Sequence, residues 1–144
     1  MAASPPLVES WSGAPDLIGL AARHPERYPG LFCTRGDTGW DILFACPREV
    51  VRVDSAQALA AHPAMRLAPA AAPASAVSGP PFRGGWLVFL AYEFGGALEP
   101  SVPSRADGAA PLAWLARVPA AVLVDRSRHV CWLVAEAGAG ACLA

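Results

Sequence analysis

Two carboxylates that follow apolar residues are the first candidates for acid/base chemistry. Asp41 stands between Trp40 and Ile42, and Glu93 follows Tyr92 at the end of another apolar run. Brought together, the two could exchange a proton with a substrate. The alternative makes Asp41 a hydrogen-bonded buried carboxylate or a strand end, and Glu93 an acid in the first turn of a helix. The sequence favours this alternative, because nothing in it shows that the two residues meet.

Nucleophilic chemistry has little support in the sequence. Ser127 stands near His129, but both fall in a polar turn without the orienting acid that a hydrolase triad requires. All eleven basic residues are arginines, so the chain contains no lysine and cannot form a lysine Schiff base. No catalytic residue is therefore expected.

The four cysteines do not predict a metal site. Cys33, Cys46, Cys131 and Cys142 form no CxxC pair, and the three histidines are not at ligand spacing from them. Three of the four lie in or beside apolar runs, where a free thiol behaves as a small hydrophobic side chain. We therefore expect unpaired thiols in a reducing compartment.

Two short motifs have structural explanations that outweigh the functional ones. The tripeptide Arg35-Gly36-Asp37 matches a cell-adhesion signal, but glycine and aspartate also suit a hairpin turn. The glycine pairs at 84–85 and 95–96 lack the pattern of a phosphate-binding loop, so we favour the interpretation that these glycines allow close backbone packing.

Length and composition favour one compact globular unit. The chain has 144 residues, of which 54% are hydrophobic, and a formal net charge of -1. Its arginines are scattered, so a nucleic-acid partner is not expected. Residues 1–6 do not begin a signal peptide, and no run reaches the length of a membrane span. We expect a soluble cytoplasmic protein without a membrane partner.

The pattern of apolar and turn residues predicts an α+β fold made mainly of antiparallel strands. The expected strands are 28–34, 40–46, 50–53, 86–92, 120–124 and 130–134, and the expected short helices are 16–24, 55–61 and 93–99. Turn-rich segments at 35–39 and 125–128 predict two hairpins. The unbroken apolar run at 86–92 is typical of a strand buried on both faces, so the centre of the core is expected there.

The remaining segments give weaker indications. Residues 64–81 are rich in alanine and proline and predict a surface connector without core residues. Residues 101–111 predict a loop, and 112–116 are ambiguous. The small residues at 137–144 are expected neither to cap a helix nor to finish a strand.

Three segments carry motifs of a known family. Residues 28–34 (YPGLFCT) and 40–47 (WDILFACP) are similar to the patterns YPxLLxS and (R/F)DILxAxP, and residues 81–95 (PFRGGWLVFLAYEFG) are similar to PFxGGxxGYxxYExG. Asp125 lies in a turn where the family has PxxxxxDH. In this order the segments resemble the amino-terminal domain shared by component I of aminodeoxychorismate synthase and of anthranilate synthase, and the YEFG and WDIL segments favour the aminodeoxychorismate branch.

The resemblance implies a tryptophan pocket, which by position Phe32, Thr34, Trp40 and Asp41 would line. The sequence departs from the family at several motif positions. Thr34 replaces the usual serine and keeps a hydroxyl, whereas Cys33 cannot supply a charged partner. Val88 and Ala91 stand where the family has glycines.

For the whole enzyme, the resemblance implies amination of chorismate to 4-amino-4-deoxychorismate for p-aminobenzoate and folate synthesis. That reaction uses Mg²⁺, and a glutaminase partner delivers the ammonia. The family's catalytic residues lie in a later chorismate-binding region outside these 144 residues. We therefore expect a domain, part of a β-sandwich, that is inactive alone and comes from a truncated or split component I. Two alternatives stay open: the matching domain of anthranilate synthase, and a non-enzymatic ligand-sensing or interaction module.

Overall fold

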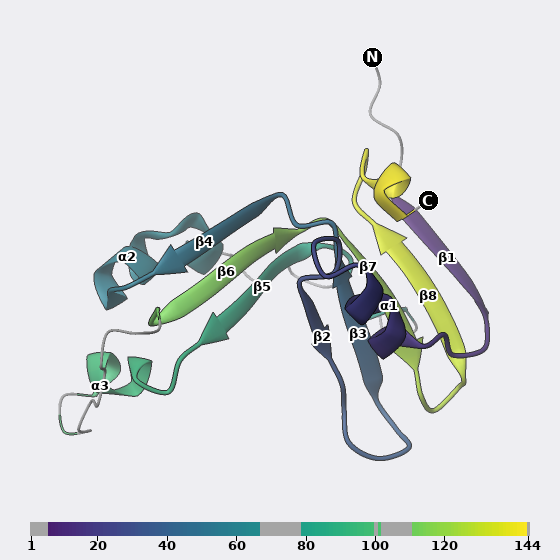
Figure 1. Ribbon diagram of the computed structural model, residues 1–144, viewed down its shortest axis with the longest axis horizontal. Coiled ribbons are helices and arrows are strands. Elements are labelled where there is room, and N and C mark those ends of the chain that lie inside the picture. Colours follow the sequence, from purple (N-terminus) through teal and green to yellow (C-terminus); the bar gives the residue numbers. More distant parts are fainter. Residues whose placement is uncertain (1–5, 67–78, 100, 102–110, 144) are drawn as a thin grey trace. The chain divides into compact units, whose positions relative to one another are not determined.

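The computed structural model describes residues 6–66, 79–99, 101 and 111–143. These described residues form two compact units. Those within 1–48, 79–87 and 117–144 form the first unit, and those within 49–78 and 88–116 form the second. The described part is mainly antiparallel β-sheet with short helices, which confirms the expected fold class (Figure 1).

A five-stranded antiparallel sheet with the order β1-β8-β7-β3-β2 forms the first unit. Its strands are β1 (Leu7–Ser12), β2 (Gly30–Phe32), β3 (Trp40–Ala45), β7 (Ala120–Asp125) and β8 (Val130–Ala135). The hairpins β2–β3 and β7–β8 are the two that the turn signals predicted. All six residues of the central strand β7 are buried.

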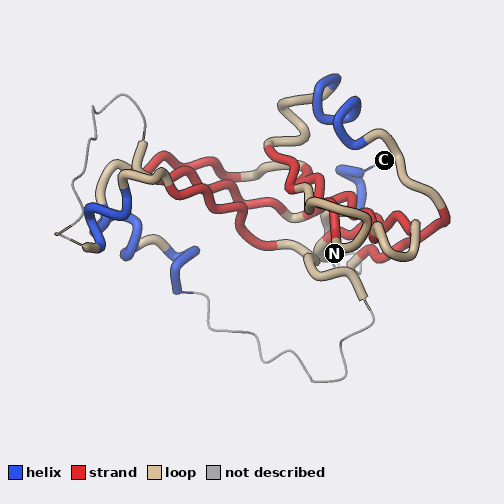
Figure 2. The backbone as a smooth tube through the Cα atoms, turned by 90° about the horizontal axis from the view of Figure 1, so that it is seen from below, coloured by secondary structure: helices blue, strands red, loops and turns tan. Residues whose placement is uncertain are grey.

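Each face of this sheet carries its own apolar cluster, because successive side chains of a strand point to opposite faces. On one face Leu17, from helix α1 (Leu17–Arg23), packs with Leu43, Val122, Val124 and Cys131. Figure 2 shows α1 standing beside the strands of this sheet. On the other face Ala121, Leu123 and Val134 pack with Trp40, Ile42, Phe82 and Trp132.

Helix α1 begins directly after Asp16, the first residue of the predicted helix. The Asp16 side chain accepts a hydrogen bond from the Gly19 N–H at 2.8 Å, which satisfies one of the free amides of the first turn. The helix ends at Arg23, just before Pro25. The predicted helix at 16–24 is therefore confirmed.

A three-stranded sheet with the order β4-β6-β5 contains β4 (Glu49–Val53), β5 (Gly85–Leu90) and β6 (Ala113–Val118). Residues 49–53, 88–90 and 113–116 of this sheet belong to the second unit, whereas residues 85–87 and 117–118 belong to the first. The second unit also contains α2 (Ala56–Ala61), the 3₁₀ turn η1 (Pro63–Arg66) and α3 (Phe94–Leu98). Ser55 caps α2 by accepting a hydrogen bond from the Ala58 N–H at 3.1 Å. The strands expected near 50–53 and 86–92 and both short helices are confirmed.

The predicted burial of β5 is wrong. No residue of β5 is fully buried, and Val88, Phe89 and Leu90 are exposed. The centre of the first unit's core lies instead in β7, which has sheet neighbours on both sides and an apolar cluster on each face. A continuous apolar run does not distinguish a strand covered on both faces from one whose face is uncovered.

Three segments differ from the sequence prediction in smaller ways. Ala64, expected in a connector without core residues, is buried in η1. The strand β1 was not predicted, although it pairs along its whole length with β8. The carboxyl-terminal residues form the 3₁₀ turn η2 (Gly140–Leu143), and Ala139 before it is buried. Residues 67–78 of the expected connector and residues 102–110 of the expected loop lie outside the described residues.

Within the described ranges, none of the helices has both the length and the apolar character needed to cross a membrane.

Candidate functional site

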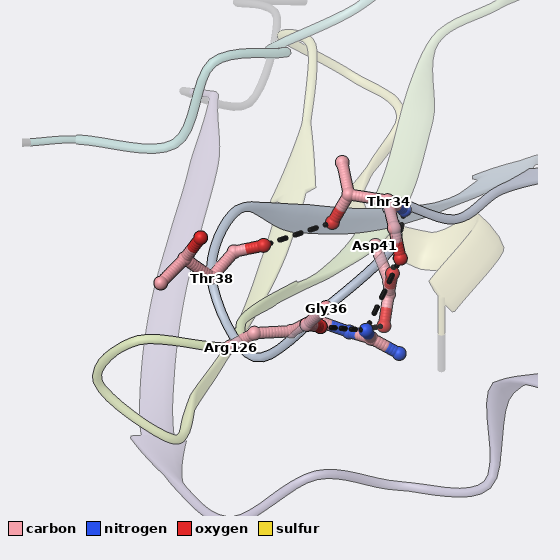
Figure 3. A network of polar contacts seen from close by, with 5 residues as sticks. All are labelled: Thr34, Gly36, Thr38, Asp41 and Arg126. Atoms are coloured by element: carbon pink, nitrogen blue, oxygen red, sulfur yellow. Dashed lines mark hydrogen bonds and ion pairs between the residues drawn. The ribbon is translucent and has the colours of Figure 1, made fainter.

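Asp41 is the centre of a polar network at one end of the five-stranded sheet (Figure 3). It is the second residue of β3 and is buried. Its Oδ1 accepts a hydrogen bond from the Thr34 N–H at 3.2 Å, and its Oδ2 accepts one from Arg126 Nε at 2.8 Å. Both carboxylate oxygens therefore have partners, which agrees with the interpretation of Asp41 as a hydrogen-bonded buried carboxylate.

Arg126 joins the turns of the two hairpins. It follows β7, and its Nη1 donates to the carbonyl oxygens of Thr34, at 3.1 Å, and Gly36. Its backbone N–H donates to the Gly39 carbonyl at 3.0 Å. The hydrogen bond to Asp41 raises the pKa of the Arg126 guanidinium, so this side chain stays charged. One arginine thus fixes the β2–β3 turn against the β7–β8 turn.

The Thr34 hydroxyl completes the network within the β2–β3 turn. Thr34 Oγ1 donates to the Thr38 carbonyl at 3.2 Å. The turn includes the Arg35-Gly36-Asp37 tripeptide, and Gly36 has a positive φ of 87° that suits glycine. These contacts support the turn interpretation of the tripeptide.

A cavity of about 370 Å³ adjoins this network. Its lining carries both signs of charge, with two carboxylates, one guanidinium and one imidazole. The lining residues are Ala14, Gly36, Asp37, Asp41, Val124, Arg126 and His129. A second hollow of about 210 Å³, beside α1, shares Ala14, Asp41, Val124 and Arg126 with the first. Such a lining suits binding of a small polar or zwitterionic molecule.

The four residues expected in a tryptophan pocket do not share one face of the sheet. Thr34 and Asp41 are joined by a hydrogen bond. Trp40 packs in the cluster on the opposite face, and Phe32 pairs directly with Ile42, which belongs to that same cluster. Of the four, only Asp41 lines either cavity. Tryptophan binding stays a prediction.

Cys33 lines the hollow beside α1. Its partial burial and the neighbouring Asp41 carboxylate raise the pKa of the Cys33 thiol. The thiol is therefore neutral at physiological pH and adds no charge to this hollow.

The other candidate catalytic residues, Glu93, Ser127 and His129, lie on separate elements of the fold from Asp41. Glu93 belongs to the second unit and precedes α3, where its side chain makes no capping hydrogen bond. Ser127 and His129 are exposed in the β7–β8 turn, and His129 has a positive φ of 54°. Two carboxylates line the cavity with His129: Asp37, and Asp41, which already accepts two hydrogen bonds.

A second ionic contact holds the glycine pair of the PFRGG segment. Arg117 Nη2 donates to both oxygens of Glu136, at 2.7 and 2.6 Å, and Nη1 donates to the Gly85 carbonyl at 3.0 Å. Gly84 has a φ of 117°, and a Cβ at this position would lie 2.2 Å from Glu136 Oε1. For Gly84 the close-packing interpretation is confirmed.

Sequence reasoning missed Arg117, Arg126 and Glu136, which hold the two motif segments in place. The sequence contained only a weak indication of these contacts. Arg126 lies in the predicted turn after β7, and a charged residue there is ordinarily solvated.

Neither a scan against protein-family models nor a search of curated proteins finds a match to this chain.

Proposed function

We propose that the chain is a non-catalytic scaffold domain of an aminodeoxychorismate synthase component I. The amination of chorismate would be carried out by the chorismate-binding region of component I, which packs against this domain. In this proposal the protein is cytoplasmic, and Mg²⁺ and the ammonia from a glutaminase subunit act at that region.

The observation that carries the proposal is the exposed apolar surface of the PFRGGWLVFLAYEFG segment. Phe89 is 58% exposed and Leu90 is 47% exposed, and Tyr92, just beyond the strand, is 88% exposed. Large apolar side chains that gather on one strand usually mark a surface that another polypeptide covers. This segment is also the longest motif that resembles the family, so the exposed strand and the resemblance support the same proposal.

The polar network supports a positioning role rather than a catalytic one. The Asp41 carboxylate and the Arg126 guanidinium are engaged with each other and with the backbone of the β2–β3 turn. Their arrangement stabilises the two hairpins and shapes the cavity beside them.

Calorimetry with a separately produced chorismate-binding region of component I tests the scaffold role. The proposal expects saturable binding that Phe89→Asp weakens at least tenfold. Asp37→Asn is the matched control, because Asp37 is exposed in the β2–β3 turn of the first unit. Absence of binding by the unchanged chain would contradict the proposal.

The anthranilate synthase alternative predicts tight tryptophan binding of the kind that supports feedback inhibition. A tryptophan titration of the chain, compared with the Asp41→Asn variant, separates the two branches. Tight binding that needs Asp41 would favour the anthranilate branch. For the non-enzymatic alternative, the discriminating observation is the reading frame downstream of residue 144 in the source genome.

A further inference from the structure

Two cysteines far apart in the sequence meet in the first unit. Cys46 directly follows β3, and Cys142 lies in η2, 96 residues later. The Cys46 thiol donates a hydrogen bond to the Cys142 carbonyl, with Sγ 3.0 Å from the oxygen. Both cysteines also pack against the same cluster of buried alanines, Ala45, Ala120, Ala135 and Ala139.

The fold holds Cys46 in this position. Its backbone adopts a positive φ of 60°, which is uncommon for a residue other than glycine. The Cys46 N–H donates to the Arg27 carbonyl at 2.7 Å. Its neighbour Ala45 is fully buried in a cluster of small residues with Ala120, so the end of β3 has little freedom to shift.

The fold also holds Cys142. Its N–H donates to the Ala139 carbonyl at 3.1 Å, and Ala139 is buried in the same cluster as Ala45. The Arg27 side chain donates to the Cys142 carbonyl. Arg27 therefore connects to both cysteines, through its backbone to Cys46 and through its guanidinium to Cys142.

The environment keeps the Cys46 thiol protonated. Burial, followed by the hydrogen bond with Cys142, raises its pKa to about 12. A protonated thiol is a poor nucleophile toward an external oxidant, but a thiol already beside a mixed disulfide can resolve it. Because the Cys46 thiol is held protonated, Cys142 is the thiol that we expect to react with the oxidant first.

We propose that Cys46 and Cys142 are a redox modification site that forms a reversible disulfide, tying η2 to the end of β3 when the chain meets a low-molecular-weight disulfide. First, the Cys142 sulfur loses its proton and attacks one sulfur of the oxidant. This forms a mixed disulfide and releases one thiol, which takes up the proton. Cys46 then loses its proton, attacks the Cys142 sulfur and expels the second thiol. Two protein thiols are oxidised and one external disulfide is reduced to two thiols.

Oxidation changes the stability of the chain in a predictable direction. The bond joins residues that are 96 positions apart, and a crosslink that closes a long loop restricts the unfolded chain strongly. We expect the melting temperature to rise by about 5 °C or more on oxidation and to return on addition of a thiol reductant. This inference does not depend on the proposed function.

Peptide mapping after incubation of the folded chain with oxidised glutathione tests the site. Cleavage after arginine and after glutamate separates the four cysteines into peptides 28–35, 36–48, 129–136 and 137–144. The expected product is a disulfide between 36–48 and 137–144, with the peptides of Cys33 and Cys131 unlinked. The same incubation in denaturant is the control. In the unfolded chain we expect no preference for the disulfide between Cys46 and Cys142 over the other pairings.

Substitutions of single cysteines by serine, which is similar in size, test the site without a large change in packing. Cys46→Ser is expected to stop the reaction at the mixed disulfide on Cys142, and Cys142→Ser to leave Cys46 unmodified. Cys33→Ser is the matched control, because Cys33 is exposed elsewhere in the same unit, and it should leave the crosslink unchanged. A folded chain in which Cys46 stays free under oxidised glutathione, or joins another cysteine, would overturn the proposal.

Discussion

The Oδ2 atom of Asp41 lies 2.8 Å from the Nε atom of Arg126, a residue 85 positions later in the chain. The Asp41 side chain is 12% exposed and that of Arg126 is 35% exposed, so the pair is only partly screened by water. Because Arg126 also binds the backbone of the β2–β3 turn, this contact joins the two hairpins that carry the family-like residues.

Neutralising Asp41 should therefore destabilise the chain. Asp41→Asn keeps an oxygen for the Thr34 N–H but removes the charge that faces Arg126. We expect a loss of about 1–3 kcal/mol in the free energy of unfolding, typical of a charge-assisted hydrogen bond left without its partner. Urea denaturation measures it. Asp37→Asn, in the exposed turn, should change stability by less than about 0.5 kcal/mol, and equal losses in the two variants would contradict the assigned role of Asp41.

Gly84 should tolerate a side chain less well than Gly36. Both have positive φ angles, 117° and 87°, but only at Gly84 would the added Cβ meet another group, the Glu136 carboxylate held by Arg117. We expect Gly36→Ala to cost about 1 kcal/mol for backbone strain alone. Gly84→Ala should cost at least about twice as much, because it also disturbs the ion pair. Thermal melts of both variants check this order, which would be refuted if Gly36→Ala were the more damaging change.

Truncation of side chains in β7 and β5 tests where the core lies. Leu123 is fully buried at the centre of the five-stranded sheet, whereas Phe89 is 58% exposed. We expect Leu123→Ala to cost about 2–5 kcal/mol. Phe89→Ala, although it removes more atoms, should cost less than about 1 kcal/mol. Denaturant titrations of the two variants compare their free energies of unfolding. A larger loss of stability for Phe89→Ala would contradict the assignment of the core to β7 and would favour the predicted core at 86–92.

Alkaline pH should weaken the fold through Cys131. Burial raises the pKa of this thiol from 9.0 to about 11, so the folded chain keeps a proton that the unfolded chain releases. The stabilisation is fully present below pH 9 and is lost as the pH rises through 11. We expect the free energy of unfolding to fall more steeply across this window in the unchanged chain than in Cys131→Ala. Chemical denaturation at pH steps measures the two slopes, and parallel slopes would show that Cys131 does not titrate in this way.

Local signals in the sequence were sufficient for the hairpins and for the short helices. Glycine and aspartate in short polar segments predicted the β2–β3 and β7–β8 turns, and the expected helices 16–24 and 55–61 match α1 and α2. These features depend on residues only a few positions apart, so they are readable without the fold.

The remaining features depend on partners that are distant in the sequence. β1 has the mixed sequence LVESWS and is defined by its pairing with β8. The apolar run of β5 gives no information about which of its faces is covered. The contact of Arg126 with Asp41 spans 85 residues, and that of Cys46 with Cys142 spans 96. No local pattern predicts such contacts.

The most direct test of the scaffold role is a turnover assay with chorismate, glutamine, Mg²⁺ and a glutaminase subunit, run with and without a separately produced chorismate-binding region of component I. Our account predicts 4-amino-4-deoxychorismate only when that region is present, with a higher yield when this chain is added and a smaller increase with Phe89→Asp. Formation of the product by this chain and the glutaminase alone would contradict the account, because it would place the reactive groups within these 144 residues.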